Sequence, residues 1–282
     1  MWANKLVNIV LVVDDGGFPF SNGDYGNSID IEPYEHLLEL AKMHSTVIPI
    51  DITAGYLDID RISNPKIVNK NAEKIVKLLR ENTDSLPVWN HGLTHSFKGL
   101  PTEFLFYDSP EKIPESIQQE HLELSQKIFE YLELGRPAVF VPPGNAWEAG
   151  VTDRIAKNLG FKAIAVRQFE KTPLKQWICA LGKAYKQVWK KSEYIDTYWR
   201  LGVGVSSLKR RINKYDVWKS FKYIQPPNRL VNYAVNRSWK RPQAPHHFFA
   251  HIQNFCNTGS IKHWSNIIKK LVQSQKERRF EK

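Results

Sequence analysis

The stretch LVNIVLVVDDGG, residues 6–17, joins an apolar run directly to two acids and two glycines. Residues 6–13 are rich in valine, which is typical of a strand buried on both faces of a parallel sheet. Asp14 and Asp15 come at the end of that strand, where burying either charge without a partner would be costly. A metal ion on one carboxylate removes this cost and leaves the other free to act as a base. The alternative is that the pair caps the segment that follows.

Strand-like and helix-like segments alternate outward from this stretch. Alternation of this kind predicts βαβ units with parallel strands, and the number of repeats indicates a barrel or a doubly wound sheet. The further predicted strands are residues 47–52, 86–90, 138–141, 161–166 and 247–252. The predicted helices are residues 34–43, 69–80, 113–134, 152–159 and 261–275.

The alternation weakens in residues 171–243, which are basic and rich in tryptophan and tyrosine. We therefore expect a single domain over residues 1–282, in which residues 171–243 form an insertion or a cap before the last strand. The whole chain has 40 Lys and Arg against 29 Asp and Glu, a net charge of +11. A basic surface attracts polyanions such as anionic lipid or an acidic glycan, although it can equally serve only to keep the chain soluble.

Several compartments and partners are disfavoured by the sequence. No recognisable nucleic-acid motif is present, so no specific nucleic-acid partner is expected. Cys179 and Cys256 are too few for a disulfide framework and fit a reducing compartment. The first apolar stretch lacks the features of a signal peptide, and no stretch reaches the roughly 20 apolar residues of a membrane span. These features predict a cytoplasmic protein, with peripheral membrane contact through residues 171–243 as a further expectation.

Polar or conformationally special residues lie at the ends of four of the predicted strands. Because the carboxyl ends of parallel strands gather at one edge, these residues are expected to share one site. They are Asp14 and Asp15, then His91 and His95, then Pro142, Pro143, Gly144 and Asn145, and finally His251.

Asp15, His91 and His95 are the candidate metal ligands. Two histidines four residues apart can reach one ion from a turn or a helix, and a carboxylate completes a donor set that suits Zn²⁺, with Co²⁺ or another divalent ion as alternatives. Three protein ligands leave positions open for water and substrate, as in catalytic sites. A lone pair of histidines would more often simply be packed, but the adjoining aspartate pair favours the metal.

His251 is the candidate general acid, because histidine titrates near neutral pH. Its strand is otherwise apolar from Phe248 to Ile252. His246 or His247 could serve instead, or could only pack.

These elements, in this order, resemble the polysaccharide deacetylase family, also called the NodB-homology or carbohydrate esterase family 4 group. The matching motifs are the aspartate pair before Gly16, the His-x-x-x-His of residues 91–95, the proline-rich strand end at residues 142–144 and the late histidine His251. The resemblance covers roughly residues 6–167 and 245–275. It implies an α/β fold, a distorted (β/α) barrel of about seven parallel strands.

The resemblance also implies a reaction. Asp14 would be the general base, Asp15 would bind the metal with His91 and His95, and His251 would be the general acid. Water deprotonated by Asp14 would attack an acyl carbonyl, in the family an N-acetyl group, that the metal polarises. The implied enzyme is a metal-dependent deacetylase that cleaves amide bonds other than peptide bonds. Its implied substrate is an acylated carbohydrate or glycan precursor, with anionic or lipid-linked precursors as candidates.

The third motif departs from the family pattern. The family has an arginine that positions the base where this chain has Val141, and Arg167 is one candidate replacement. The missing arginine leaves open a catalytically silent glycan-binding protein of the same fold. The residues expected to contact substrate are Pro143, Gly144, Asn145 and Trp147, although Asn145 could instead cap the next helix.

Overall fold

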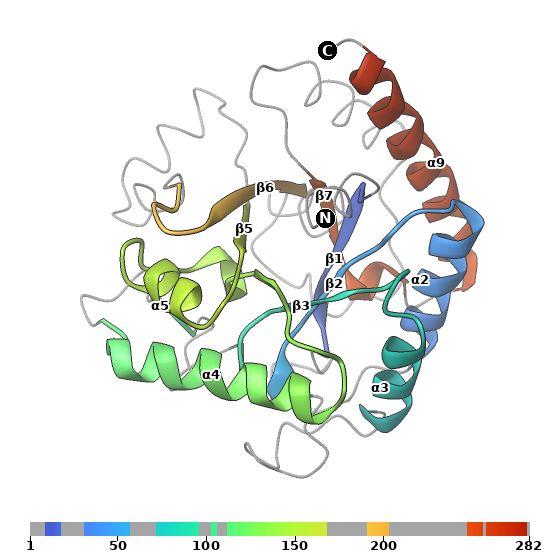
Figure 1. Ribbon diagram of the computed structural model, residues 1–282. Coiled ribbons are helices and arrows are strands. Elements are labelled where there is room, and N and C mark those ends of the chain that lie inside the picture. The colour runs from blue at the N-terminus through green and yellow to red at the C-terminus, as the bar shows by residue number, and fades with distance from the viewer. Residues whose placement is uncertain are drawn as a thin grey trace, which may run out of the picture.

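The strands of this protein close into a barrel, and the helices lie around the outside of it (Figure 1). The computed structural model describes residues 9–17, 31–56, 72–95, 103–105, 112–167, 191–202, 247–255 and 258–280. Within these residues, seven parallel strands follow one another around the barrel in chain order, and β1 pairs with β7 to close it. The expected barrel of about seven parallel strands is confirmed.

The strands are short and the helices that separate them are longer. The strands are β1 (Leu11–Gly16), β2 (Ile50–Ile52), β3 (Val88–Asn90), β4 (Val139–Phe140), β5 (Ala163–Arg167), β6 (Asp196–Gly202) and β7 (His247–His251). The helices are α2 (Glu32–Met43), α3 (Ala72–Glu81), α4 (Glu115–Tyr131), α5 (Thr152–Asn158) and α9 (Thr258–Phe280), with short 3₁₀ turns η2 (Ala54–Tyr56), η4 (Pro143–Asn145) and η7 (Ile252–Phe255).

Two features differ from the sequence-based expectation. Strand β1 runs through both aspartates, which were expected to end it. Strand β6 was not predicted and lies inside residues 171–243, so this range contributes a barrel strand. The assignment of the remainder of that range to an insertion or cap stays a prediction, because most of it lies outside the described residues. Among the described helices, none is both long and apolar enough to cross a membrane.

Side chains alternate along each strand between the barrel interior and the surrounding helices, as the two-residue period of a strand requires. The interior is filled by a cluster separate from the two clusters beneath the helices: Ile9, Val12, Trp89, Val139, Val141, Ala163, Ala165 and Phe249. By the same alternation Asp14, Asp51 and Arg200 point inward, because their strand neighbours pack against the helices. Three ionisable side chains, those of Asp14, Asp51 and Arg200, therefore enter a mainly apolar interior.

The last helix fixes the end of β7. In α9, Trp264 is buried and stacks on Phe255 at 4.7 Å between ring centroids, and its Nε1 donates to the Asn254 carbonyl at 3.1 Å. Asn254 Oδ1 in turn accepts from the backbone amide of His251 at 3.1 Å. Packing of α9 thereby helps to fix the backbone of His251 at the carboxyl end of its strand.

Candidate metal centre

Five of the residues expected from sequence meet at the carboxyl ends of the barrel strands. Asp14 is directly opposite His251 in the register of β1 and β7. Asp15 follows on β1, and His91 and His95 lie just beyond β3. All strands of the barrel are parallel, so these groups share one mouth of it.

The imidazoles of His91 and His95 converge on one oxygen of Asp15. His91 Nε2 lies 3.4 Å and His95 Nε2 lies 3.6 Å from Asp15 Oδ1. Two ligand atoms that each lie about 2.1 Å from one zinc ion, at tetrahedral angles, are roughly 3.4 Å apart. His91 Nε2 is buried and makes no hydrogen bond within the described part of the chain. The donor set and its spacing therefore fit a divalent metal ion.

The tautomer of His91 is set from its other side. His91 Nδ1 lies 2.8 Å from the carbonyl oxygen of Val141. A carbonyl only accepts, so Nδ1 carries a proton, and in the neutral tautomer that a metal would bind Nε2 presents its lone pair toward Asp15. Val141, where the family pattern has an arginine, thus orients a candidate metal ligand through its backbone.

Backbone strain concentrates at the same mouth. Among the described non-glycine residues with positive φ, Asp15 (64°), His95 (63°) and Asn145 (62°) all belong to the expected site. The other two, Ser45 and Glu133, follow the C-caps of α2 and α4, where a left-handed residue is ordinary. Strain without such a local explanation gathers where function holds the backbone in place.

Asp14 is held inside the barrel by an arginine that the sequence reasoning did not find. Arg200 on β6, only 2% exposed, donates from Nη1 to Asp14 Oδ1 at 3.1 Å and to Asp51 Oδ2 at 2.9 Å. Its guanidinium lies 5.0 Å from the ring centre of Phe249. Arg200 therefore joins β1, β2 and β6 at the level of the candidate base.

The pKa values of the two acids beside Arg200 are shifted in opposite directions. Burial alone would raise the pKa of Asp14, but Arg200 and a hydrogen bond from Asp51 hold that pKa well below its usual range. Burial, and then the neighbouring Asp14 carboxylate, raise the pKa of Asp51 well above its usual range. The two shifts run in opposite directions, so Asp14 is the more readily ionised of the two buried acids.

The missing arginine of the third motif thus has a counterpart from another strand. The side chain of Arg167, the replacement considered from sequence, lies outside the described residues. A signal for Arg200 was present, because Thr197, Trp199 and Leu201 alternate with it and place it on the opposite face of a strand. The signal is short and lies within the basic, aromatic range 171–243, where the alternation of strands and helices is weak.

Replacement of Arg200 is expected to destabilise the fold strongly. Arg200→Ala leaves two carboxyl groups in the barrel without their cation, and breaking a buried pair costs about 3–5 kcal/mol. Urea unfolding of the metal-free protein at neutral pH measures this. Arg154→Ala is the matched control, because it removes an exposed ion pair with Glu115 at 2.8 Å, where losses stay below about 1 kcal/mol. Equal losses in the two variants would contradict the structural role of Arg200.

His251 faces both aspartates from β7. Its Nε2 lies 3.6 Å from Asp15 Oδ2 and 4.0 Å from Asp14 Oδ2. His247 lies four residues earlier, about 13 Å further down the strand, beside Trp89 and with Nδ1 3.3 Å from the Ile9 carbonyl. His246 lies outside the described residues. Of the described candidates, His251 is the one at the mouth.

The residues expected to contact substrate follow β4. Pro143, Gly144 and Asn145 form the turn η4, and Asn145 does not cap the next helix, since Val151 is the N-cap of α5. Trp147 is 1% exposed and packs in the apolar cluster between β4, β5 and the helices. Their contact with substrate stays a prediction.

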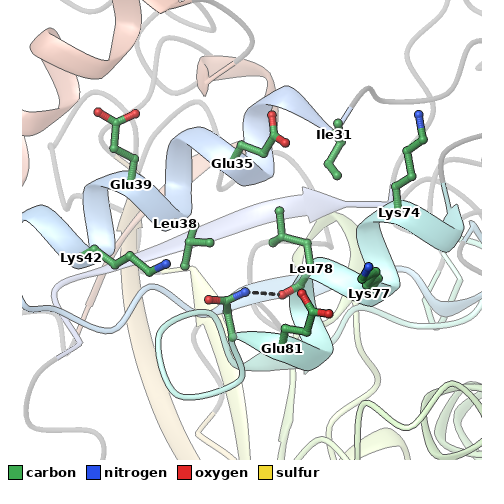
Figure 2. Close-up of a pocket in the computed structure, with 10 residues that line it drawn as sticks. Ile31, Glu35, Leu38, Glu39, Lys42, Lys74, Lys77, Leu78 and Glu81 are labelled. Carbon is green, nitrogen blue, oxygen red and sulfur yellow. Dashed lines mark hydrogen bonds between the residues drawn. The ribbon is translucent and has the colours of Figure 1, made fainter.

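A groove with a volume of about 590 Å³ lies away from this mouth, between α2 and α3. Figure 2 shows the lysines and glutamates that line it beside Leu38 and Leu78. It contains none of the candidate metal or proton-transfer residues. The groove therefore plays no part in the site.

Comparison with known proteins gives a likeness of fold. No protein-family model and no curated protein match the sequence. A mutant CE4 family pseudoenzyme "with restored enzymatic activity" shares 13% identity at a TM-score of 0.50, over 94% of this chain and 62% of that one. The wild-type CE4 family pseudoenzyme from Bacillus anthracis gives 12% identity and a TM-score of 0.48, over 95% of this chain and 62% of that one. A family 4 carbohydrate esterase from Streptomyces lividans in complex with acetate gives 11% identity and a TM-score of 0.48, over 95% of this chain and 88% of that one. The likeness to the first supports the fold that the motifs implied, although this chain spans 62% of its length.

Proposed function

We propose that this chain, which shares its fold with a CE4 family structure, is a metal-dependent hydrolase that removes an acyl group from a carbohydrate or glycan precursor. An N-acetyl group is the proposed leaving acyl, so an amide bond outside peptides would be cleaved. The observation that carries the proposal is the meeting, at one mouth of the barrel, of the Asp15, His91 and His95 donor set with Asp14, which Arg200 holds.

The proposed metal is Zn²⁺, with Co²⁺ as a working substitute. When bound by Asp15, His91 and His95, it would polarise the acyl carbonyl and stabilise negative charge on its oxygen. Asp14 would take the proton of the attacking water. The hydrogen bonds from Arg200 and Asp51 support this role, because they keep the Asp14 carboxylate ionised and fixed in position.

His251 would complete the reaction as the acid. After water adds to the carbonyl, the carbon–nitrogen bond breaks and the departing nitrogen needs a proton. His251 Nε2, within 4.0 Å of the Asp14 carboxylate, would supply it, releasing a free amino sugar and acetate.

The substrate is proposed to contact the turn of Pro143, Gly144 and Asn145 beyond β4, whereas Trp147 is buried in the apolar cluster and offers it no surface. The net charge of +11 favours an anionic precursor, for instance one that carries phosphate on a lipid. A cytoplasmic location with contact at a membrane surface belongs to the same proposal. Cys179 and Cys256, which suggested a reducing compartment, lie outside the described residues, as does most of the basic range 171–243.

Acetate release tests the proposal. We expect the full chain, supplied with Zn²⁺ or Co²⁺, to release acetate from at least one member of a panel of N- and O-acetylated sugars, and to stop when a chelator removes the metal. Enzyme-coupled acetate detection measures this. The alternative is a catalytically silent glycan-binding protein, for which binding without release across the panel would be the result. Arg200 weakens the case for that alternative, because it provides the buried arginine whose absence first suggested it.

A further inference from the structure

Glu103 is fully buried beside the segment that carries both candidate histidine ligands, yet it is no ligand itself. Its carboxylate accepts hydrogen bonds from three consecutive backbone amides. Leu93 N lies 2.9 Å from Oε1 and 3.1 Å from Oε2, Thr94 N lies 3.3 Å from Oε2, and His95 N lies 3.1 Å from Oε2. The backbone from Leu93 to His95 therefore curves around the Glu103 carboxylate and donates to it.

Two further contacts fix that carboxylate. His121 of α4 lies with Nδ1 2.7 Å from Glu103 Oε1, and because the carboxylate only accepts, Nδ1 carries the proton. On the opposite side, a Cβ at Gly92 would overlap Glu103 Oε2, so the segment can close over the carboxylate only with glycine there. The φ of Gly92 is +81°, a conformation that also favours glycine.

The segment has no helix or strand to shape it. Residues 91–95 follow β3 as an irregular bend, and His95 has a left-handed φ of 63°. Its successive amides find their acceptor in Glu103, and hydrogen bonds to a charged acceptor are stronger than those between neutral groups. The direction of the His95 side chain thus depends on a carboxylate eight residues further along the chain.

We infer that Glu103 is a positioning residue of the metal centre: it fixes the bend that turns His91 and His95 toward Asp15. The inference rests on the metal site of the proposed function and assigns no chemical step to Glu103. It predicts that the length and acceptor position of residue 103, more than its charge, control metal affinity. Groups that orient metal ligands in this way typically contribute about 10- to 100-fold to affinity.

The test is a Co²⁺ titration of the metal-free full chain, followed by visible absorption and by competition with a chelating indicator. Three variants separate length from charge. Glu103→Ala removes every acceptor. Glu103→Asp keeps the charge but places the carboxylate one methylene further from the amides. Glu103→Gln removes the charge but keeps an oxygen for the amides. Its NH₂ group can face His121, whose Nδ1 accepts a hydrogen bond in the other neutral tautomer. Glu115→Ala, at an exposed carboxylate on α4, is the control.

We expect Glu103→Ala and Glu103→Asp to bind Co²⁺ about 10- to 100-fold more weakly with altered absorption, and Glu103→Gln and Glu115→Ala to stay within about threefold of wild type. A folded Glu103→Ala with wild-type affinity and spectrum would overturn the inference. If that variant does not fold, the other two decide: weaker binding by Glu103→Asp than by Glu103→Gln supports the inference, and equal affinities overturn it. A wild-type chain that binds no Co²⁺ would overturn both the inference and the proposed function. Wild-type binding that no Glu103 variant changes would overturn only the inference.

Discussion

His91→Ala and Asp15→Ala are each expected to purify without stoichiometric divalent metal, whereas the wild-type chain should bind about one ion. Each variant removes one of three convergent donors. The distances of 3.4 and 3.6 Å from Asp15 Oδ1 to the Nε2 atoms of His91 and His95 are those expected of donors that share one ion. Without it, His91 Nε2 would be a buried lone pair with no hydrogen bond among the described residues, which is a costly arrangement. Elemental analysis after removal of loosely bound ions measures the effect.

The control for this experiment is a histidine outside the site. His44, whose Nε2 lies 2.9 Å from Ser265 Oγ between α2 and α9, belongs to neither of the convergent donor sets found among the described residues, so His44→Ala should keep the metal. Circular dichroism and thermal melting in chelator establish that all variants are folded. Metal retained at wild-type stoichiometry by both His91→Ala and Asp15→Ala would place the ion elsewhere and remove the basis of the site.

The candidate metal ligands could be predicted from the sequence because their signals are local. An apolar strand that ends in Asp14 and Asp15, and a strand followed by His91 and His95, each occupy a few consecutive residues. The rule that parallel strands end at one edge then brings these short signals together without any knowledge of contacts. The same rule predicted a histidine of the last strand at the site but could not distinguish His251 from His247. The register of β7 against β1 was needed to show that His251 is the residue opposite Asp14.

The residues that support the site escaped prediction because their partners are remote in the chain. Arg200 pairs with Asp14 and Asp51 across 186 and 149 residues, and no local pattern records such a pairing. Asp51 was part of a predicted buried strand, where one acid among apolar neighbours had no visible partner. Glu103 lies in an irregular stretch, where neither the helical nor the strand period marks it.

Arg200 also bears on the choice between an active and a silent protein. A glycan-binding surface needs exposed polar and aromatic groups. It does not need a buried carboxylate that accepts a hydrogen bond from a buried arginine inside a barrel. Maintaining Asp14, Arg200 and Asp51 in the interior requires desolvating all three groups, which is costly unless each is paired. The role proposed for Asp14, a base that must be ionised and correctly placed, would account for this arrangement.

Asp14→Asn is the variant expected to separate chemistry from metal binding. Asparagine keeps an oxygen that can accept from Arg200 but cannot take a proton from water, so acetate release should fall by about 10²–10⁴-fold in kcat, the usual contribution of a general base. The metal content should remain that of the wild type, because Asp15, His91 and His95 are untouched. Asp84→Asn, an exposed acid in the turn after α3, is the matched control and should retain activity.

The pattern across variants decides between the hypotheses. An enzyme of the proposed kind loses metal and activity together in Asp15→Ala, but activity alone in Asp14→Asn. Activity in Asp14→Asn equal to that of Asp84→Asn would show that another group takes the proton, and the role of Arg200 would then be confined to stability. A silent protein would release no acetate from any substrate, and its glycan affinity would be the same in wild type and Asp14→Asn. The Asp14 carboxylate is held by Arg200 and Asp51 at one side and faces His251 at the other. We therefore expect Asp15→Ala to lose metal and activity together, and Asp14→Asn to lose activity alone.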